Sequence, residues 1–466
     1  MSQSRLNAAR RAIAEGLVGF GERDPRTALL IDWRVAMEAV REMREAFSSE
    51  EGGPQWLHCF AAKGNPVGEI LRKLHRDGGM GVEAASMGEL LAAHEGAEIA
   101  AGHLVFDSPI KTPTELRYAL SRGIFLNLDN FQELQRVREL IPQVEETSPG
   151  CTAGLRLGLR VNPQVGAGSL EGFSTGAQVS KFGVPIEQRE GILAAFQETP
   201  QLNALHVHAG SQGMNFVLQV AAIRALVDLA QEINSAVGRR QVHILDVGGG
   251  LSVNFGSDEV APSFGDYAQA LRAGVPELFS AGSPFSLIVT EFGRAVLAKA
   301  GFVMCTVEYT KESGGRHLAA IHSGADLFIR TVYLPQQWPL RLHLLDSSGA
   351  PKCPISTSAD PQPQGPGLFE TDIVGPCCFS MDVVAHRRML PEIDPGDFIL
   401  VLDTGAYFHS SFSLYNSRSA PGVFLFHSDA TCVNPLSSTS EEFVCVCKPQ
   451  TSDFTLSFFD THRKSA

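Results

Sequence analysis

One lysine ends an apolar run and is followed directly by a turn. The stretch is His58-Cys-Phe-Ala-Ala-Lys63-Gly-Asn-Pro66, and the Gly-Asn-Pro segment opens a helix. A lysine at the C-terminal end of a buried strand lies where a barrel or an open α/β sheet places its chemistry. Partial desolvation there can lower the pKa of the amine and leave a nucleophile, as a Schiff base with an aldehyde requires. A lysine that merely extends into solvent would fit the same pattern.

Polar residues and glycines follow the other predicted strands in the same way. They are Glu83-Ala-Ala-Ser86, Arg160-Val-Asn162, His206-Val-His208-Ala-Gly-Ser211, Asp246-Val-Gly248-Gly249-Gly250 and Glu291-Phe-Gly293-Arg294. Three glycines let backbone N–H groups approach a phosphate, although a triplet is more often a tight turn. Alone, His208 fits a core histidine and Glu291 a salt-bridged strand end. Together the residues supply an amine, a flat ring, an anion cradle and a carboxylate beside an arginine, the set that pyridoxal 5'-phosphate needs.

Alternating strands and helices must position these residues. Strand-like runs lie near 55–61, 79–84, 103–107, 123–128, 155–161, 202–208, 241–247 and 285–291. Amphipathic helical stretches separate them, for example 66–76, 86–95, 112–122, 130–140, 213–236 and 263–280. Eight such units over roughly 240 residues predict an α/β fold with a (β/α)8 TIM-type barrel at 35–300. After residue 300 helical periodicity fades, which predicts a mainly β domain at 301–466 with a mobile loop at 346–370. Residues 1–34, a leader helix and a strand, are expected to pack on that β domain.

Composition excludes several classes of partner. The 466 residues are 44% hydrophobic and 19% charged, with 38 basic and 51 acidic side chains. The net charge of −13 argues against nucleic acid and anionic membrane as partners. No apolar run approaches about 20 residues and no signal core follows the N-terminal arginines, so we expect a cytoplasmic protein. The nine cysteines form no pair of CxxC motifs, so we expect reduced thiols and no metal, with Cys445 and Cys447 on one face of a strand.

In their order and spacing these motifs resemble the fold-type III pyridoxal-phosphate decarboxylases, which act on diaminopimelate, ornithine or arginine. The resemblance runs from about residue 27 to 420. It rests on Ala62-Lys63-Gly64-Asn65, Glu83-Ala-Ala-Ser86 (where the family usually begins with Asp), Arg160-Val-Asn162-Pro163 with Lys181-Phe-Gly183, His208-Ala-Gly-Ser211-Gln212, Glu291-Phe-Gly-Arg294 (Phe292 replacing Pro), Gly375-Pro-Cys-Cys378 and Asp403-Thr-Gly405-Ala406-Tyr407.

The resemblance implies a role for each of these residues. The catalytic residues would be Lys63, which carries the cofactor, His208, which stacks on its ring, and Cys378, which protonates the substrate carbon after decarboxylation. Cofactor-binding residues would be Lys63, Glu83, Arg160, His208, Ser211, Gly248, Gly249, Gly250, Glu291 (facing the ring nitrogen), Gly293, Arg294 and Tyr407. Substrate-binding residues would be Arg294, Arg330, Phe379 and Tyr407. Because the family's cysteine enters the neighbouring active site, the resemblance implies a homodimer with shared sites.

One departure concerns the substrate. Family members that act on lysine, ornithine or diaminopimelate carry Asp or Glu directly after the cysteine, where this chain has Phe379. A phenylalanine cannot pair with an ammonium ion, so we expect a decarboxylase for another amino acid or an amino-acid derivative. Two alternatives are a racemase or epimerase of the alanine racemase type, which shares the barrel, and a non-catalytic regulatory paralogue. Glu291 and Cys378 argue against the first, and the retention of Lys63 and the glycine loop argues against the second.

Overall fold

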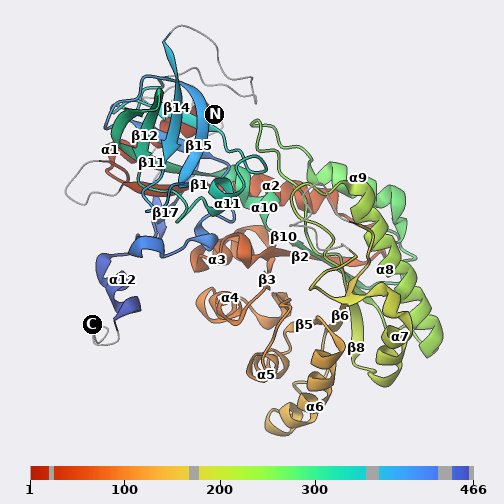
Figure 1. Cartoon of the computed structure of the whole chain (residues 1–466). Coiled ribbons are helices and arrows are strands. Elements are labelled where there is room, and N and C mark those ends of the chain that lie inside the picture. The colour runs from red at the N-terminus through yellow and green to blue at the C-terminus, as the bar shows by residue number, and fades with distance from the viewer. Residues whose placement is uncertain (1, 20–25, 167–177, 353–366, 429–442, 461–466) are drawn as a thin grey trace. The chain divides into compact units, whose positions relative to one another are not determined.

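The computed structural model describes residues 2–19, 26–166, 178–352, 367–428 and 443–460. The chain forms two compact units, shown in Figure 1. The barrel unit comprises 39–253 and 261–296, and the β unit comprises 1–38, 254–260 and 297–466. Residues 254–260 lie inside the predicted barrel range of 35–300, yet they group with the β unit, where Arg341 binds Asp258 at 2.6 Å.

Within the described residues of the barrel unit, eight parallel strands close on themselves. They are β2 (Gln55–Ala61), β3 (Gly81–Ala84), β4 (Leu104–Phe106), β5 (Phe125–Leu128), β6 (Leu157–Asn162), β8 (Leu202–His206), β9 (Ile244–Asp246) and β10 (Leu287–Phe292). Each strand pairs with the next, β10 pairs with β2, and the pairing of β5 with β6 completes the ring. A short strand, β7 (Val184–Pro185), adds to β6. The predicted (β/α)8 barrel and all eight predicted strands are confirmed.

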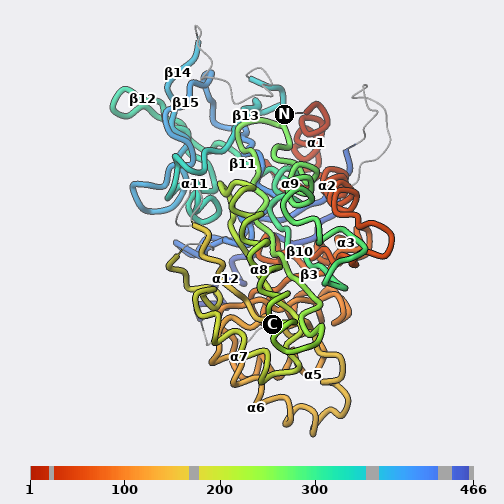
Figure 2. The backbone as a smooth tube through the Cα atoms, turned by 90° about the vertical axis from the view of Figure 1, so that its right-hand side faces the viewer, coloured from red at the N-terminus to blue at the C-terminus, as the bar shows by residue number. Residues whose placement is uncertain are grey.

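Amphipathic helices connect the strands. They are α3 (Gly68–Gly78), α4 (Met87–Leu91) with its π-type continuation η2 (Ala92–Gly96), α5 (Pro113–Ser121), α6 (Phe131–Thr147), α7 (Arg189–Glu198), α8 (Phe216–Val237) and α9 (Phe264–Gly274). Figure 2 traces the chain through α5, α6, α7 and α8, from orange to green. Local chemistry sets their ends: Thr112 and Glu115 form a capping box at α5, and Gly79, with φ +64°, ends α3.

The barrel interior changes from apolar to charged along the strands. A buried apolar cluster consists of Cys59, Val105, Phe125, Ala204, Ile244 and Val289. Two residues further along the same strands come Ala61, Asp107, Asn127, His206, Asp246 and Glu291. Because side chains alternate with a period of two, both sets lie on the same side of their strands. An apolar layer is therefore followed, at the carboxyl ends, by a layer that is mostly polar and charged.

The β unit is built on a branched sheet. Its described strands are β1 (Thr27–Asp32), β11 (Gly301–Ser313), β12 (Arg316–Ile321), β13 (Leu342–Leu345), β14 (Leu368–Val374), β15 (Val383–Pro391), β16 (Phe398–Leu402), β17 (Gly422–Phe426) and β18 (Val444–Cys447). They pair in the order β15-β14-β12-β11-β1-β17-β18, and β16 joins β11 to β13. The mainly β second domain is thus confirmed. Residues 353–366 of the predicted loop lie outside the described residues.

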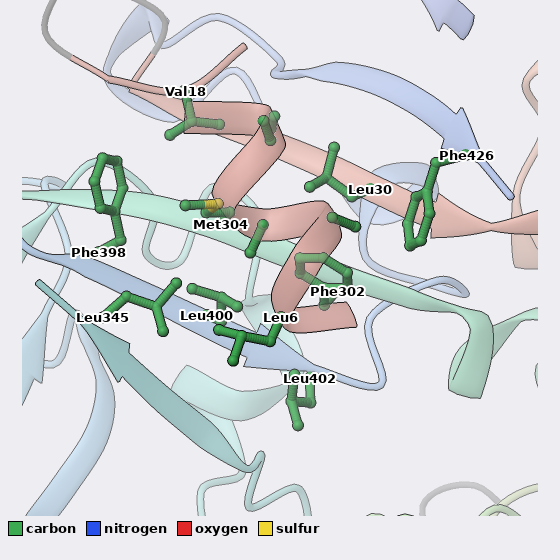
Figure 3. Packing of buried hydrophobic residues seen from close by; sticks show 14 residues of the cluster. Leu6, Val18, Leu30, Phe302, Met304, Leu345, Phe398, Leu400, Leu402 and Phe426 are labelled. Carbon is green, nitrogen blue, oxygen red and sulfur yellow. The ribbon is translucent and has the colours of Figure 1, made fainter. Parts of the chain in front are cut away.

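Helices of the β unit are few and short. They are α1 (Gln3–Ala14), α11 (Ile329–Tyr333) and α12 (Ser452–Phe459), while α2 (Trp33–Ala46) and α10 (Arg294–Leu297) contain boundaries between the units. Helix α1 packs Leu6 into an apolar core with Leu30, Phe302, Met304 and Leu400 (Figure 3). None of the helices in the described residues has the length and apolarity that crossing a bilayer requires.

Candidate active site

Lys63 lies at the carboxyl end of β2, in the single helical turn η1 (Ala62–Gly64). Its Nζ donates to Oε2 of Glu83 at 2.7 Å. Strands β2 and β3 pair Ala61 with Glu83, so Lys63 begins two residues beyond the level of Glu83 and its amine reaches back to the carboxylate. Burial raises the pKa of the Glu83 carboxyl to about 8, although the Lys63 charge acts to lower it. The carboxylate of Glu83 thus contacts the Lys63 amine, although the family usually has aspartate at this position.

Glu291 occupies the corresponding end of β10 and is 1% exposed. Its Oε2 lies 3.3 Å from Nδ1 of His208, which follows β8. The other oxygen, Oε1, is buried and has no hydrogen-bond partner among the described residues. A buried acceptor of this kind fits a ring N–H such as that of a protonated pyridine. The site therefore fits the cofactor that the sequence predicted.

The glycine loop packs closely against its neighbours. Gly248 and Gly250 have φ +68° and +98°, a region that favours glycine. A Cβ at Gly249 would lie 2.2 Å from the Glu291 carbonyl oxygen. The Gly249 nitrogen lies 3.3 Å from Nδ1 of His208, and the Gly248 N–H donates to Asp246. The loop thus holds the histidine ring and the Glu291 backbone, a role that the sequence did not predict, besides its predicted approach to phosphate.

Arg160 points toward acidic partners inside the barrel unit. Its Nη1 lies 3.2 Å from Oδ2 of Asp107 and 4.0 Å from Oδ1 of Asp129. Its guanidinium also lies over the Phe182 ring, 4.5 Å from the centroid. Arg160 is therefore fixed by protein side chains that the sequence analysis did not include.

The remaining predicted residues of the barrel unit follow the same strands. Ser211 comes after His208 and is partly exposed, and its carbonyl accepts from the Ser252 hydroxyl at 3.4 Å. Gly293 and Arg294 come directly after β10, and Arg294 is 6% exposed. A Cβ at Gly64 would approach Gly293 Cα at 3.5 Å, which shows how close the ends of β2 and β10 are.

Four buried polar residues at the site received no role from the sequence: Asp107 and Asn127, which were not singled out, and His206 and Asp246, which were noted only as part of strand-end motifs. Asn127 donates to Oδ2 of Asp246 at 2.9 Å, and His206 lies between Asp107 and Glu291. Their signal in the sequence is the period of two, since His206 precedes His208, and Asp246 precedes Gly248, by two residues. The residues with no predicted role therefore lie in the same alternating pattern as the predicted ones.

The predicted residues of the β unit form two groups. The Arg330 guanidinium lies over the rings of Tyr407, at 4.8 Å, and Trp338, at 5.4 Å. Cys378 is exposed, and its N–H donates to Oδ1 of Asn416 at 2.7 Å.

Phe379 belongs to a group of three rings. It stacks on Tyr333, with centroids 5.8 Å apart and planes 14° apart, and meets Tyr415 edge-on at 6.0 Å. Asp382, a carboxylate close by in sequence, accepts the N–H groups of Ala325 and Cys377, each at 2.6 Å. Both of its oxygens are thus engaged in holding the backbone around Cys378.

Residues 36–298 match the family model described as "Pyridoxal-dependent decarboxylase, pyridoxal binding domain". Over 399 residues the chain is 30% identical to diaminopimelate decarboxylase of Pseudomonas aeruginosa, covering 84% of this chain and 86% of that protein. The same enzyme of Methanothermobacter thermautotrophicus is 28% identical over 402 residues, 85% of each chain. Among solved structures, a mutant diaminopimelate decarboxylase from Helicobacter pylori complexed with L-lysine superposes with a TM-score of 0.75 at 25% identity, covering 93% and 96% of the two chains.

These similarities bear on the expectations drawn from the sequence. They favour decarboxylation over the racemase and the non-catalytic alternatives. They do not support the expectation that Phe379 excludes diaminopimelate, because the relatives above are named for that substrate. That expectation took a paired carboxylate to be the only way to hold an ammonium, whereas aromatic faces can also do so.

Proposed function

The chain belongs to the fold-type III pyridoxal-dependent decarboxylases, and on that premise we propose that it removes the α-carboxylate of a diaminopimelate-type amino acid. It is a carboxy-lyase that uses pyridoxal 5'-phosphate. The observation that carries the proposal is the placement of the Lys63 amine, the His208 ring and the Glu291 carboxylate at the carboxyl ends of barrel strands.

In the proposed site each residue has a distinct task. Lys63 attaches the cofactor through its amine, which Glu83 orients at 2.7 Å. Glu291 presents Oε1 to the ring N–H, and the His208 ring keeps a fixed plane with its Nδ1 3.3 Å from Oε2 of Glu291. Bound pyridoxal phosphate supplies the sink for the electron pair left when carbon dioxide departs. Ser211, Gly250 and Arg294 are proposed to contact the phosphate, with Tyr407 and Arg330 as further proposed contacts for phosphate and carboxylate.

Borohydride reduction of the loaded protein tests the attachment site. We expect a pyridoxyl group on Lys63 by peptide mass mapping, and no visible pyridoxal band in Lys63→Ala. Lys73→Ala is the matched control, because Lys73 pairs with Asp77 on helix α3 and takes no part in the site. A pyridoxyl group on another lysine, with Lys63 unmodified, would overturn this assignment.

Two observations bear on the substrate. The named relatives support a diaminopimelate-type substrate. The rings of Phe379, Tyr333 and Tyr415 could receive its distal ammonium by cation–π contact, worth about 0.5–2 kcal/mol. The same three rings favour a second candidate, an amino acid whose distal end is apolar.

Steady-state kinetics separate the two candidates. We would measure kcat/KM for meso-diaminopimelate, lysine, ornithine and a set of apolar and acidic amino acids. The first candidate predicts at least about a tenfold preference for diaminopimelate, equal to about 1.4 kcal/mol. An apolar amino acid turned over faster than diaminopimelate would establish the second candidate instead. No carbon dioxide release from any amino acid would refute decarboxylation.

We further propose that the active unit is a homodimer in which Cys378 completes the neighbouring site. The exposure of Cys378 fits a residue that acts outside its own fold. Mixing inactive Lys63→Ala with inactive Cys378→Ala subunits should restore part of the activity, since one hybrid site regains both groups. Demonstrated subunit exchange without recovery would contradict a shared site.

A further inference from the structure

A second histidine, His206, lies beside Glu291 inside the barrel. Its side chain is 0% exposed. Nδ1 lies 3.5 Å from Oδ1 of Asp107, and Nε2 lies 3.6 Å from Oε2 of Glu291. These separations are ion-pair contacts, longer than ordinary hydrogen bonds. One imidazole therefore bridges two buried carboxylates from the ends of β4 and β10.

Charged groups from the neighbouring strands face this imidazole. Asp246 is paired with His206 on β9, Arg160 is paired with it on β6, and Asp107 follows β4. Burial alone would lower the pKa of His206, but the charges of Asp107, Asp246 and Glu291 together raise it to about 9. At neutral pH the ring is thus an imidazolium that compensates the surrounding carboxylates.

Glu291 behaves differently from the equally buried Glu83. Burial raises the pKa of Glu83 to about 8 even though Lys63 contacts it. Burial acts on Glu291 in the same direction, yet the charge of His206, helped by His208 and Lys63, holds its pKa well below the usual range. The largest favourable charge on Glu291 is the His206 imidazolium, with a further contact from His208, whereas Glu83 is contacted by Lys63.

We propose that His206 is a positioning residue that keeps Glu291 ionised and thereby keeps the ring nitrogen of bound pyridoxal phosphate protonated. The inference rests on the proposed function and assigns to it a residue outside the predicted site. Without the imidazolium, Glu291 would share its surroundings with Glu83, Asp107 and Asp246, and crowded buried carboxylates take up protons. A neutral carboxyl would no longer favour a protonated ring, and the ring would draw electrons from the substrate less strongly.

The protonation state can be read in the cofactor-free protein. We would incorporate histidine labelled with ¹⁵N in the imidazole, record its signals across the pH range, and assign His206 as the signal missing in His206→Gln. We expect a doubly protonated ring that loses its proton only near pH 9. Glu291→Gln should lower that titration midpoint, and His206→Phe provides the assignment if His206→Gln does not fold. A neutral His206 at about pH 7 in the wild-type protein would overturn the proposal.

Kinetics of the loaded enzyme give the second readout. His206→Gln should lower kcat at least about tenfold while changing KM less than about threefold, because electron withdrawal is lost and binding is kept. His58→Gln is the matched control: His58 is also buried in the barrel unit but bonds Thr290, and its replacement should leave kcat unchanged. Equal kcat values for wild type and His206→Gln would refute the role. Absence of decarboxylation by the wild type would instead refute the proposed function, and the titration would still report on His206.

Discussion

Replacing Gly249 by alanine tests whether the glycine loop and Glu291 form one packed unit. A Cβ at this position would lie 2.2 Å from the Glu291 carbonyl oxygen and 2.9 Å from its carbonyl carbon. Non-bonded heavy atoms rest at about 3.5 Å, so the strand or the loop must move by about 1 Å. The Glu291 N–H is bonded to the Gly248 carbonyl at 2.7 Å, so this movement displaces the carboxylate proposed to face the cofactor ring.

Overpacking of this kind costs about 1–3 kcal/mol. If the loop of Gly249→Ala relaxes in the cofactor-free protein, cofactor binding must restore the strained conformation. The binding free energy then loses about 1–3 kcal/mol, and the cofactor Kd rises about 5- to 150-fold. Absorbance titration of the apoprotein with pyridoxal phosphate measures this, and urea unfolding reports any strain that remains in the apoprotein. Gly282→Ala is the control, because a Cβ there meets nothing within 4 Å. Affinity within about twofold of wild type together with unchanged unfolding would refute the packed unit.

Two further substitutions test the buried polar groups of the barrel unit. Burial, followed by the Arg44 charge, lowers the pKa of His58 to about 4, so its contribution to stability is complete above pH 6.5 and is lost as pH falls toward 4. The shift corresponds to about 3 kcal/mol of unfolding free energy. When the pH falls from about 7 to about 4.5, the free energy of unfolding of His58→Asn, measured in urea, should therefore decrease by about 2 kcal/mol less than that of the wild type. Equal decreases in the two proteins would contradict this. Lys111→Met removes a 0% exposed amine 3.1 Å from Glu133 and should lower the free energy of unfolding by about 3–5 kcal/mol, partly regained by adding Glu133→Gln. A loss below about 1 kcal/mol, measured in urea, would contradict the buried pair.

The sequence by itself determined the barrel and the part of the site that lies directly at strand ends. Lys63, His208 and Glu291 each follow an apolar run, and apolar runs of strand length separated by amphipathic helices predict parallel strands. Parallel strands in a barrel end on one side, so local patterns sufficed to bring these residues together. The capping box at Thr112 and the positive φ of Gly79 show the same agreement between local chemistry and fold.

Only the tertiary structure decided which charges compensate one another. His206 meets Asp107 and Glu291 because barrel closure places the ends of β4, β8 and β10 around one interior, and no local pattern specifies those distances. Asp258 groups with the β unit, where it pairs with Arg341. Because Arg341 lies 83 residues further along the chain, no local pattern indicated this pairing. The aromatic surroundings of Phe379 likewise could not be predicted from the sequence, because Tyr333 and Tyr415 come from separate segments. The physical reason is that backbone periodicity and burial are encoded over a few residues, whereas the ionisation of a buried group depends on every charge that folding brings within a few ångströms.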